Sequence, residues 1–308
     1  MRAGARVLIG VASLWGALAL GAGAQDSGGD SGLDEWEGEQ DAGFDEWITL
    51  DEDAARPPPW VQAEVGFVGW VEARSQIRAD RRGVAGTELR NLEDEQGLDS
   101  AGIGPAFRIT FGQALRVGFK GDHLIRSGSL QQQDREVVFD GKQIAAPGDY
   151  VKTRFEFLTL GTFASWSPIA GRDYRLTVLG GLQYFRFDLE LTGTALARQS
   201  VLLRQRVRGE LLSPVFGGQF ELRPFDALGI YTRIEFMNWS WKDLELKDAQ
   251  YFDFRLGGRI YFFDDLFAFG GEYRFMLLRA RARDEDSARR VNGAVALNGL
   301  AFFLELRF

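Results

Sequence analysis

From Trp60 onward, apolar and polar residues alternate with a period of two, which is the pattern of a β-strand that has one face toward an apolar environment. The segment 251–262 shows it most clearly. Its apolar face consists of Phe252, Phe254, Leu256, Ile260 and Phe262. Its other face consists of Asp253, Arg255, Gly257, Arg259 and Tyr261. The sequence therefore predicts strands that divide an apolar surface from a polar one.

The alternation predicts an all-β fold of about ten antiparallel strands, with eight or twelve as alternatives. The predicted strands are 60–74, 101–112, 114–127, 151–166, 174–190, 208–223, 228–242, 249–263, 266–280 and 293–308. In 151–166 and 174–190 the apolar residues switch midway between odd-numbered and even-numbered positions, that is, from one face of the strand to the other. This change favours β-bulges or displaced strand boundaries there.

The lack of a long apolar run and the lengths of the connections between strands together indicate a barrel. No apolar run after residue 24 is long enough for a transmembrane helix. A chain that crosses a membrane on strands must close into a barrel, because open sheet edges cannot be hydrated in lipid. Long connections (75–100, 128–150, 191–207, 243–248, 281–292) alternate with short ones, and 137–144 forms a hairpin with a tight Asp140-Gly141 turn. This favours a transmembrane antiparallel up-and-down β-barrel with an even strand number and both termini at the short-turn end.

The N-terminal segment predicts export. Residues 1–24 have a basic start, a short apolar stretch (7–20) and the small-residue sequence Ala22-Gly23-Ala24, as in a signal peptide. The alternative, an N-terminal membrane anchor, is disfavoured because the apolar run is too short. The chain has no cysteine, which excludes disulfides, thiol catalysis and a lipid-modified N-terminal cysteine.

Charge separates a tail from the predicted barrel domain, residues 60–308. Residues 25–59 carry a net charge of −11, whereas 60–308 carry about +1, so neither part predicts nucleic-acid binding. The tail is rich in acidic residues and glycine, so we expect it to be disordered and periplasmic. It contains the unit Asp-Glu-Trp twice, ending at Trp36 and Trp47. These repeats are either a binding motif for a periplasmic partner protein or part of a solvated linker.

The last strand resembles the C-terminal signal of Gram-negative outer-membrane β-barrels. It ends in Phe308, and apolar residues precede it at alternating positions: Leu306, Leu304, Phe302 and Leu300. The resemblance is close over about ten residues and extends to the rest of the barrel only as a pattern. It implies an outer-membrane location in a lipid bilayer and recognition of Phe308, Leu306 and Phe302 by the barrel-assembly machinery. It does not indicate a subfamily.

The polar parity predicts charges of both signs in the lumen. We expect a lumen charge network made of Glu64, Arg108, Arg116, Lys120, Arg233, Glu235, Asp253, Arg255, Arg259, Glu272, Arg274 and Glu305. Glu72, Asp122 and Arg307 have the same parity. Charges inside a narrow barrel must be paired or hydrated. Inward glycines such as Gly66, Gly257, Gly270 and Gly299 leave room for long side chains. The mixture of signs favours a plugged lumen over an open, selective pore.

Aromatic residues near the strand ends predict interface belts. Trp60, Trp166, Tyr174 and Tyr261 fall at the short-turn ends, and Trp70, Tyr150, Trp239, Trp241 and Tyr251 at the long-loop ends. Two of them, Trp60 and Trp70, have the parity of the lumen side.

Candidate catalytic chemistry is sparse. The single histidine, His123, shares parity with lipid-facing residues, whereas Asp122 points to the opposite face, so we expect an interfacial, non-catalytic histidine. Acidic clusters at 93–95 with Asp99, and at 284–286, lack the spacing of a calcium loop and are expected to be solvated. We therefore predict no catalytic residue, no metal site and no cofactor.

Two functions remain open at this point. The first is a non-enzymatic envelope barrel with a narrow, ion-paired lumen, acting as a structural or partner-docking protein. The alternative is a narrow channel or transporter for small solutes or lipid-like molecules. An enzyme acting at the outer surface is disfavoured, because outer-membrane barrel enzymes generally use histidine as a base and His123 is predicted to face lipid.

Overall fold

The computed structural model describes residues 59–81, 88–89, 91–132, 136–139, 142–171, 173–195, 200–239, 246–284 and 289–308. The predicted signal peptide and almost all of the acidic tail lie outside these residues. Among the described residues, no helix is long and apolar enough to cross a membrane.

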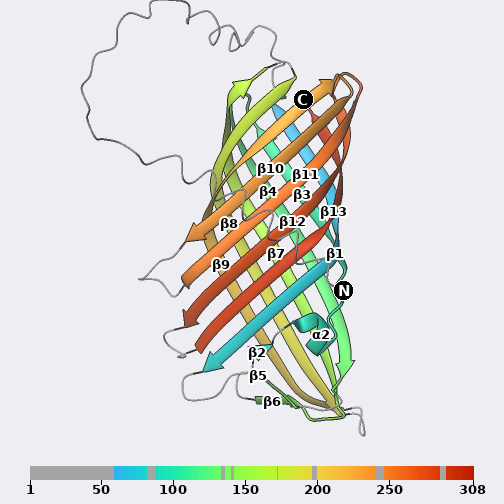
Figure 1. Ribbon diagram of the computed structural model, residues 1–308, viewed down its shortest axis with the longest axis vertical. Helices are drawn as coiled ribbons and strands as arrows, with labels where there is room; N and C mark the ends of the chain where they lie inside the picture. Colours follow the sequence, from blue (N-terminus) through green and yellow to red (C-terminus); the bar gives the residue numbers. More distant parts are fainter. Residues whose placement is uncertain are drawn as a thin grey trace, which may run out of the picture. The chain divides into compact units, whose positions relative to one another are not determined.

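Ten long antiparallel strands form the wall of a closed barrel (Figure 1). They are β1 (Val61–Arg81), β3 (Gly102–Phe111), β4 (Leu115–Gln131), β7 (Tyr150–Ala170), β8 (Tyr174–Ala195), β9 (Ser200–Phe225), β10 (Leu228–Trp239), β11 (Leu246–Phe262), β12 (Phe267–Asp284) and β13 (Arg289–Arg307). Each strand pairs with its neighbours in this order, and β13 pairs with β1 to close the ring. The prediction of a ten-stranded antiparallel barrel is confirmed.

Closure brings the two ends of the barrel domain together. The backbone N–H of Val61 donates to the carbonyl of Phe308, and the N–H of Phe308 donates to the carbonyl of Val61, both at 2.9 Å. The short connections near residues 112, 171–173, 226–227 and 263–266 lie at this same end. Short turns mark the periplasmic end of outer-membrane barrels, so we call this the periplasmic end and the opposite one the external end.

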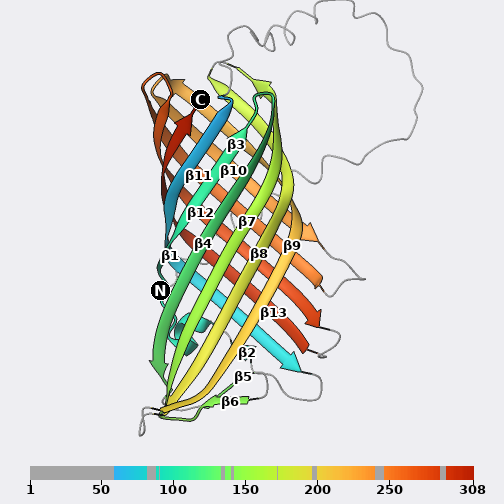
Figure 2. The same ribbon diagram turned by 180° about the vertical axis from the view of Figure 1, so that it is seen from behind.

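Four neighbouring strands extend furthest at the external end: β4, β7, β8 and β9 (Figure 2). The sequence predicted shorter strands here, and the structure extends β8 to Ala195 and β9 back to Ser200. The short segments β2 (Glu88–Leu89), α2 (Leu92–Gln96), β5 (Val137–Phe139) and β6 (Lys142–Ala145) belong to the external loops. β5 and β6 pair with each other, which confirms the predicted pairing of the hairpin. The predicted turn residues Asp140 and Gly141 lie outside the described residues.

An apolar belt surrounds the periplasmic part of the barrel. Its outward side chains are exposed and largely phenylalanine, leucine and valine, for example Phe67, Phe119, Phe216, Phe269 and Leu304. On β8 this face is uncharged from residue 174 to residue 184. Those residues rise about 33 Å along the strand, or roughly 25 Å along the barrel axis at a tilt of about 40°. The belt therefore matches the height of the apolar band of an outer-membrane barrel.

Above the belt, the two faces of the wall exchange their character. On β7 the outward residues change from Leu158 to Glu156 and Arg154, while the inward residues become Phe157 and Phe155. β8 changes in the same way beyond residue 184. The strand pairing stays regular through both changes. No bulge lies at these points, so that part of the prediction is wrong, although both strands do extend beyond their predicted bounds. The faces exchange because the wall leaves the lipid, so its outer face meets water and its inner face packs an apolar core.

That core fills the external half of the barrel. Side chains from α2 and the β5–β6 hairpin, including Leu92, Phe139 and Ile144, are almost fully buried against inward residues of the wall such as Phe155 and Leu189. The hairpin lies so close to β8 that a Cβ added at Gly193 would sit 1.8 Å from the carbonyl oxygen of Ile144. The loop segments thus form an internal plug, which we define as α2, β5 and β6.

Candidate functional site

The centre of the lumen holds a dense network of ion pairs around Arg274 of β12. Its Nη1 lies 2.7 Å from Oδ1 of Asp122, on β4 across the lumen. Its Nη2 lies 2.9 Å from Oδ2 of Asp253, on the neighbouring β11. Arg255 contacts Asp253 at 2.9 Å and Glu272 at 3.3 Å. Because Arg274 joins strands that lie four places apart in the ring, the network crosses the lumen.

Hydroxyl groups complete this network. Tyr231 donates a hydrogen bond of 2.6 Å to Glu272, Tyr251 one of 3.1 Å to Asp253, and Thr159 one of 3.0 Å to Asp122. Sequence reasoning missed both tyrosines as network members, and Tyr251 was expected at the external interface. Its parity with Asp253 was the available signal, since residues two apart on a strand share a face.

A second group of charges lies beside the first. Glu235 of β10 pairs with Lys120 of β4 and with Arg233 of its own strand. Glu235 is completely buried, and Arg233 is 2% exposed. The guanidinium of Arg108 stacks over the Phe163 ring at 4.6 Å from its centroid. A carboxylate without access to water must be paired, so these contacts keep Glu235 in place.

A third group lies toward the periplasmic end and centres on Arg259. Its guanidinium contacts Glu305 at 2.8 Å, Glu64 at 2.9 Å and Glu221 at 3.8 Å. Arg307 lies 3.2 Å from Glu305. Arg116 donates to the side-chain oxygen of Gln62 at 2.6 Å. Five strands thus contribute to this level of the lumen: β1, β4, β9, β11 and β13.

All twelve residues of the expected lumen network point inward. The structure pairs ten of them with an opposite charge: Glu64, Lys120, Arg233, Glu235, Asp253, Arg255, Arg259, Glu272, Arg274 and Glu305. Arg108 and Arg116 form no ion pair among the described residues and contact a ring and an amide instead. Asp122 and Arg307 also face the lumen.

Glu72 and some expected interface aromatics are placed differently from the prediction. A register shift between Trp70 and Glu72 reverses the parity of β1, so Glu72 points outward and pairs with Arg74 at 2.7 Å. Trp70 is buried inside, with its ring centroid 5.3 Å from the guanidinium carbon of Arg274. Tyr251 and Tyr261 are also buried inside the wall. The side chain of Trp239 and residue Trp241 lie outside the described part of the chain.

Polar contacts also hold the plug to the wall at the external end. Glu93 of α2 accepts from Arg126 of β4 at 2.8 Å and from the backbone N–H of Ser75 at 3.0 Å. The prediction of a fully solvated 93–95 cluster is therefore wrong for Glu93, since this carboxylate ties α2 to two strands. Most of the 284–286 cluster lies outside the described residues.

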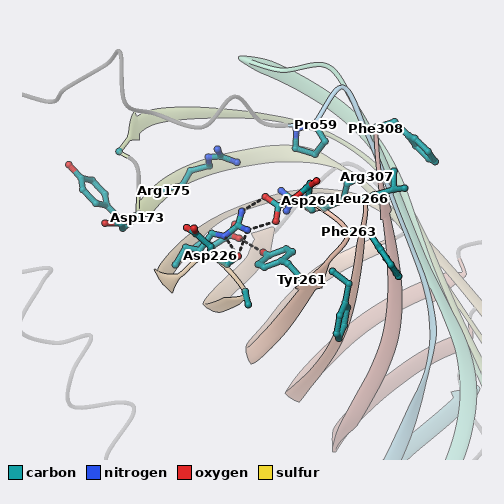
Figure 3. A pocket seen from close by; sticks show the side chains of 17 residues that line it. Pro59, Asp173, Arg175, Asp226, Tyr261, Phe263, Asp264, Leu266, Arg307 and Phe308 are labelled. Atoms are coloured by element: carbon teal, nitrogen blue, oxygen red, sulfur yellow. Dashed lines mark hydrogen bonds and ion pairs between the residues drawn. The ribbon is translucent and has the colours of Figure 1, made fainter.

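A vestibule of about 700 Å³ opens at the periplasmic end (Figure 3). Arg223 binds the carboxylate of Asp265 with an Nη1–Oδ2 distance of 2.6 Å, and its guanidinium lies 4.1 Å from the centroid of the Tyr261 ring. Tyr261 donates to Glu221 at 2.9 Å. Pro59, the last residue of the acidic tail, also lines the vestibule.

His123 faces outward, as its parity predicted. Its Nε2 lies 3.1 Å from Oε1 of Glu156 on the neighbouring strand, and Arg186 approaches the same carboxylate at 3.7 Å. Asp122 points into the lumen, so it does not orient His123. No group of three or more metal-ligating side chains occurs among the residues described.

The remaining predicted residues concern the ends of the chain. Phe308, Leu306 and Phe302 lie on the outer face of the barrel and are exposed toward the bilayer. The partner-motif residues Trp36 and Trp47 lie outside the described residues.

Comparison with known proteins supports the fold and gives no closer relationship. No protein-family model matches the chain, and no curated protein matches it. Among solved structures, the outer membrane protease OmpT from Escherichia coli matches with a TM-score of 0.52 and 11% identity, over 80% of this chain and 96% of that one. OprG from Pseudomonas aeruginosa matches with a TM-score of 0.35 and 9% identity, over 83% and 99%. The closed wall and the apolar belt of this chain, together with the fold that it shares with OmpT, are those of a transmembrane β-barrel of the outer-membrane type.

Proposed function

We propose that this protein is a non-conducting, non-enzymatic barrel that anchors a periplasmic partner to the outer membrane. The main observation in support is that charged side chains in the middle of the lumen are buried and have no access to water. Arg274, Asp253 and Glu235 are at most 1% exposed. Side chains that line a hydrated pore would be exposed to it. Their burial supports a closed lumen, with the plug as a second barrier.

The fold by itself does not decide the function. The solved structure of similar fold, OmpT, is a protease. Two features support a non-enzymatic role for this chain. Its one histidine faces outward beside Glu156 and Arg186, and the buried carboxylates are neutralised by arginine or lysine. Carboxylates held in this way are poorly suited to general-base catalysis.

The docking part of the proposal rests on the periplasmic end. The acidic segment 25–59 leads directly to Pro59 at the vestibule and carries Trp36 and Trp47 in its two repeats. Aromatic side chains are frequent anchors in protein interfaces. We also propose that the C-terminal strand is recognised by the barrel-assembly machinery, as its resemblance implies.

Single-channel conductance of the folded, full mature protein tests the closed lumen. We expect no discrete steps from the intact protein, nor from a variant that lacks residues 25–59. A second variant, with residues 136–145 replaced by a Gly-Ser linker, should also show no conductance steps because the central network remains. Steps from the intact protein would contradict the proposal and favour the alternative, a narrow channel. Steps only without residues 25–59 would instead make the tail a plug.

A pull-down from envelope extract after in vivo cross-linking tests the docking role. The double variant Trp36→Ala/Trp47→Ala should lose a periplasmic protein that the wild type captures. The matched control is Ile48→Ala/Leu50→Ala, which removes two apolar residues of the same tail outside the repeats. The same set of captured proteins from wild type and the Trp double variant would refute the role of the repeats.

A further inference from the structure

A small cavity of about 30 Å³ lies among the central charges of the lumen, next to β1, β3 and β13. Four cations from four strands line it: Arg108, Lys120, Arg233 and Arg255. Three carboxylates line it as well: Glu64, Asp122 and Glu272. A void needs about 10–15 Å³ to hold one water molecule, so this cavity has room for one small ion.

The carboxylates around the cavity are already engaged. Each is bound by an arginine: Glu64 by Arg259 at 2.9 Å, Asp122 by Arg274 at 2.7 Å, and Glu272 by Arg255 at 3.3 Å. Glu235 is shared between Lys120 and Arg233. Among the described residues, no carboxylate is therefore left to pair with Arg108.

The central lumen carries one more positive charge than negative charges. The groups around Arg274 and Glu235 contain five cations, namely Arg108, Lys120, Arg233, Arg255 and Arg274. They contain four carboxylates, namely Asp122, Glu235, Asp253 and Glu272. The excess lies where water has little access, since Lys120 is 8% exposed and Arg233 is 2% exposed. A buried charge without a counter-ion is costly, so this excess requires compensation.

The cations of the excess gather in one part of the lumen. Arg108 and Lys120 lie directly opposite each other on the paired strands β3 and β4, an arrangement that is unfavourable for like charges. The guanidinium carbons of Arg108 and Arg233 lie 4.6 Å and 5.8 Å from the centroid of the same Phe163 ring. Cations from β3, β4 and β10 thus meet beside the cavity.

Several N–H donors of these cations are available to a ligand. Arg108 forms no hydrogen bond or ion pair among the described residues. The Nε N–H of Arg233 is buried and has no acceptor among them. Lys120 has three ammonium donors, and its one printed contact is with Glu235. Guanidinium and ammonium groups can only donate, so what satisfies them must be an acceptor.

We propose that this cavity binds one small monovalent inorganic anion, chloride, between Arg108, Lys120 and the Nε N–H of Arg233. A single negative charge there balances the single excess positive charge, and the size of the cavity favours a monatomic ion. The anion completes the ion network as a structural counter-ion. This inference goes beyond the proposed docking role of the tail and does not depend on it.

Anomalous X-ray scattering from crystals of the full mature protein grown in sodium bromide tests the site directly. Bromide replaces chloride at such sites and is located by its anomalous signal. We expect one bromide peak inside the cavity, next to Arg108, Lys120 and Arg233. Bromide peaks on the protein surface together with none in the cavity would overturn the proposal.

Equilibrium unfolding by urea in lipid vesicles measures the binding of chloride in solution, with gluconate replacing chloride at constant ionic strength. For one site on the folded protein, a tenfold rise in chloride above its dissociation constant should raise the folding equilibrium constant by about tenfold. Arg108→Met should lose this dependence. The matched control, Arg116→Met, removes another lumen cation that has no ion pair among the described residues, and should keep it.

Two results of the unfolding experiment would also contradict the proposal. The first is a folding equilibrium constant of the wild type that does not change with chloride. The second is an equal loss of the dependence in Arg108→Met and Arg116→Met, because the positive charge of the whole lumen would then explain it. Heat-modifiable gel mobility reports whether each variant is folded. If Arg108→Met does not fold, the bromide positions in the wild type decide the question.

Discussion

Replacing Arg274 by methionine tests whether the lumen is a desolvated ion network or a hydrated pore. Arg274 is 1% exposed and contacts the carboxylates of Asp122 and Asp253, both within 3.0 Å. Methionine fills a similar volume but has no charge. Asp122 then keeps the hydroxyl of Thr159, and Asp253 keeps Arg255 and the hydroxyl of Tyr251. One arginine is thus removed from between the buried carboxylate of Asp253 and the half-buried carboxylate of Asp122.

The size of the effect follows from the burial. Removing one partner of a buried ion pair costs about 3–5 kcal/mol, because the remaining charge stays in a medium of low polarity. If the lumen were hydrated, water would solvate Asp122 and Asp253, and the cost would fall to the value of about 1 kcal/mol or less that exposed pairs show. The two descriptions of the lumen therefore differ by several kcal/mol in the free energy of unfolding.

Equilibrium unfolding by urea in lipid vesicles, followed by tryptophan fluorescence, measures this difference. We expect Arg274→Met to lower the free energy of unfolding by about 3–5 kcal/mol. Arg279→Met on the same strand serves as the control: its side chain is exposed, so the change should stay within about 0.5 kcal/mol. A loss below about 1 kcal/mol for Arg274→Met would refute the closed, desolvated lumen. Adding Asp122→Asn should recover part of the loss, because it removes the charge of a carboxylate that has lost its arginine partner.

Two further predictions concern the external wall and the packing of the lumen. The hydrogen bond from Arg206 holds the pKa of Asp188, above the apolar belt, below its ordinary value, so its stabilisation is present at neutral pH and is lost as the pH falls through that lowered pKa. Asp188→Asn should therefore flatten the acid side of the stability-against-pH profile, by less than about 1 kcal/mol; an unchanged profile would contradict this. Gly270→Val should destabilise the barrel by roughly 1–3 kcal/mol in the same unfolding assay, because a Cβ there would lie 2.2 Å from the Phe303 ring. Gly271→Val should be tolerated, because its Cβ would lie 3.5 Å from the nearest atom.

The sequence by itself determined the strands and most of the lumen residues. A period-two pattern is a local property, so each strand could be located from its own residues, and the parity of Asp253, Arg255 and Arg259 assigned them to the inner face. The same reasoning placed His123 on the outer face. It failed at Glu72, because a single shift of register between β1 and β13 reverses the parity of every residue beyond it.

Only the tertiary structure decided which charges meet and where the membrane ends. Arg274 and Asp122 are 152 positions apart in the chain, and the closure and register of the barrel bring them to 2.7 Å. Where a strand passes from lipid to water, its apolar residues move from the outer face to the inner face. Alternation alone reports that two faces differ, not which of them faces lipid. Whether an inward apolar residue meets the plug, as Phe155 does, depends on loops that fold back inside the wall, and that contact lies beyond the reach of any local pattern.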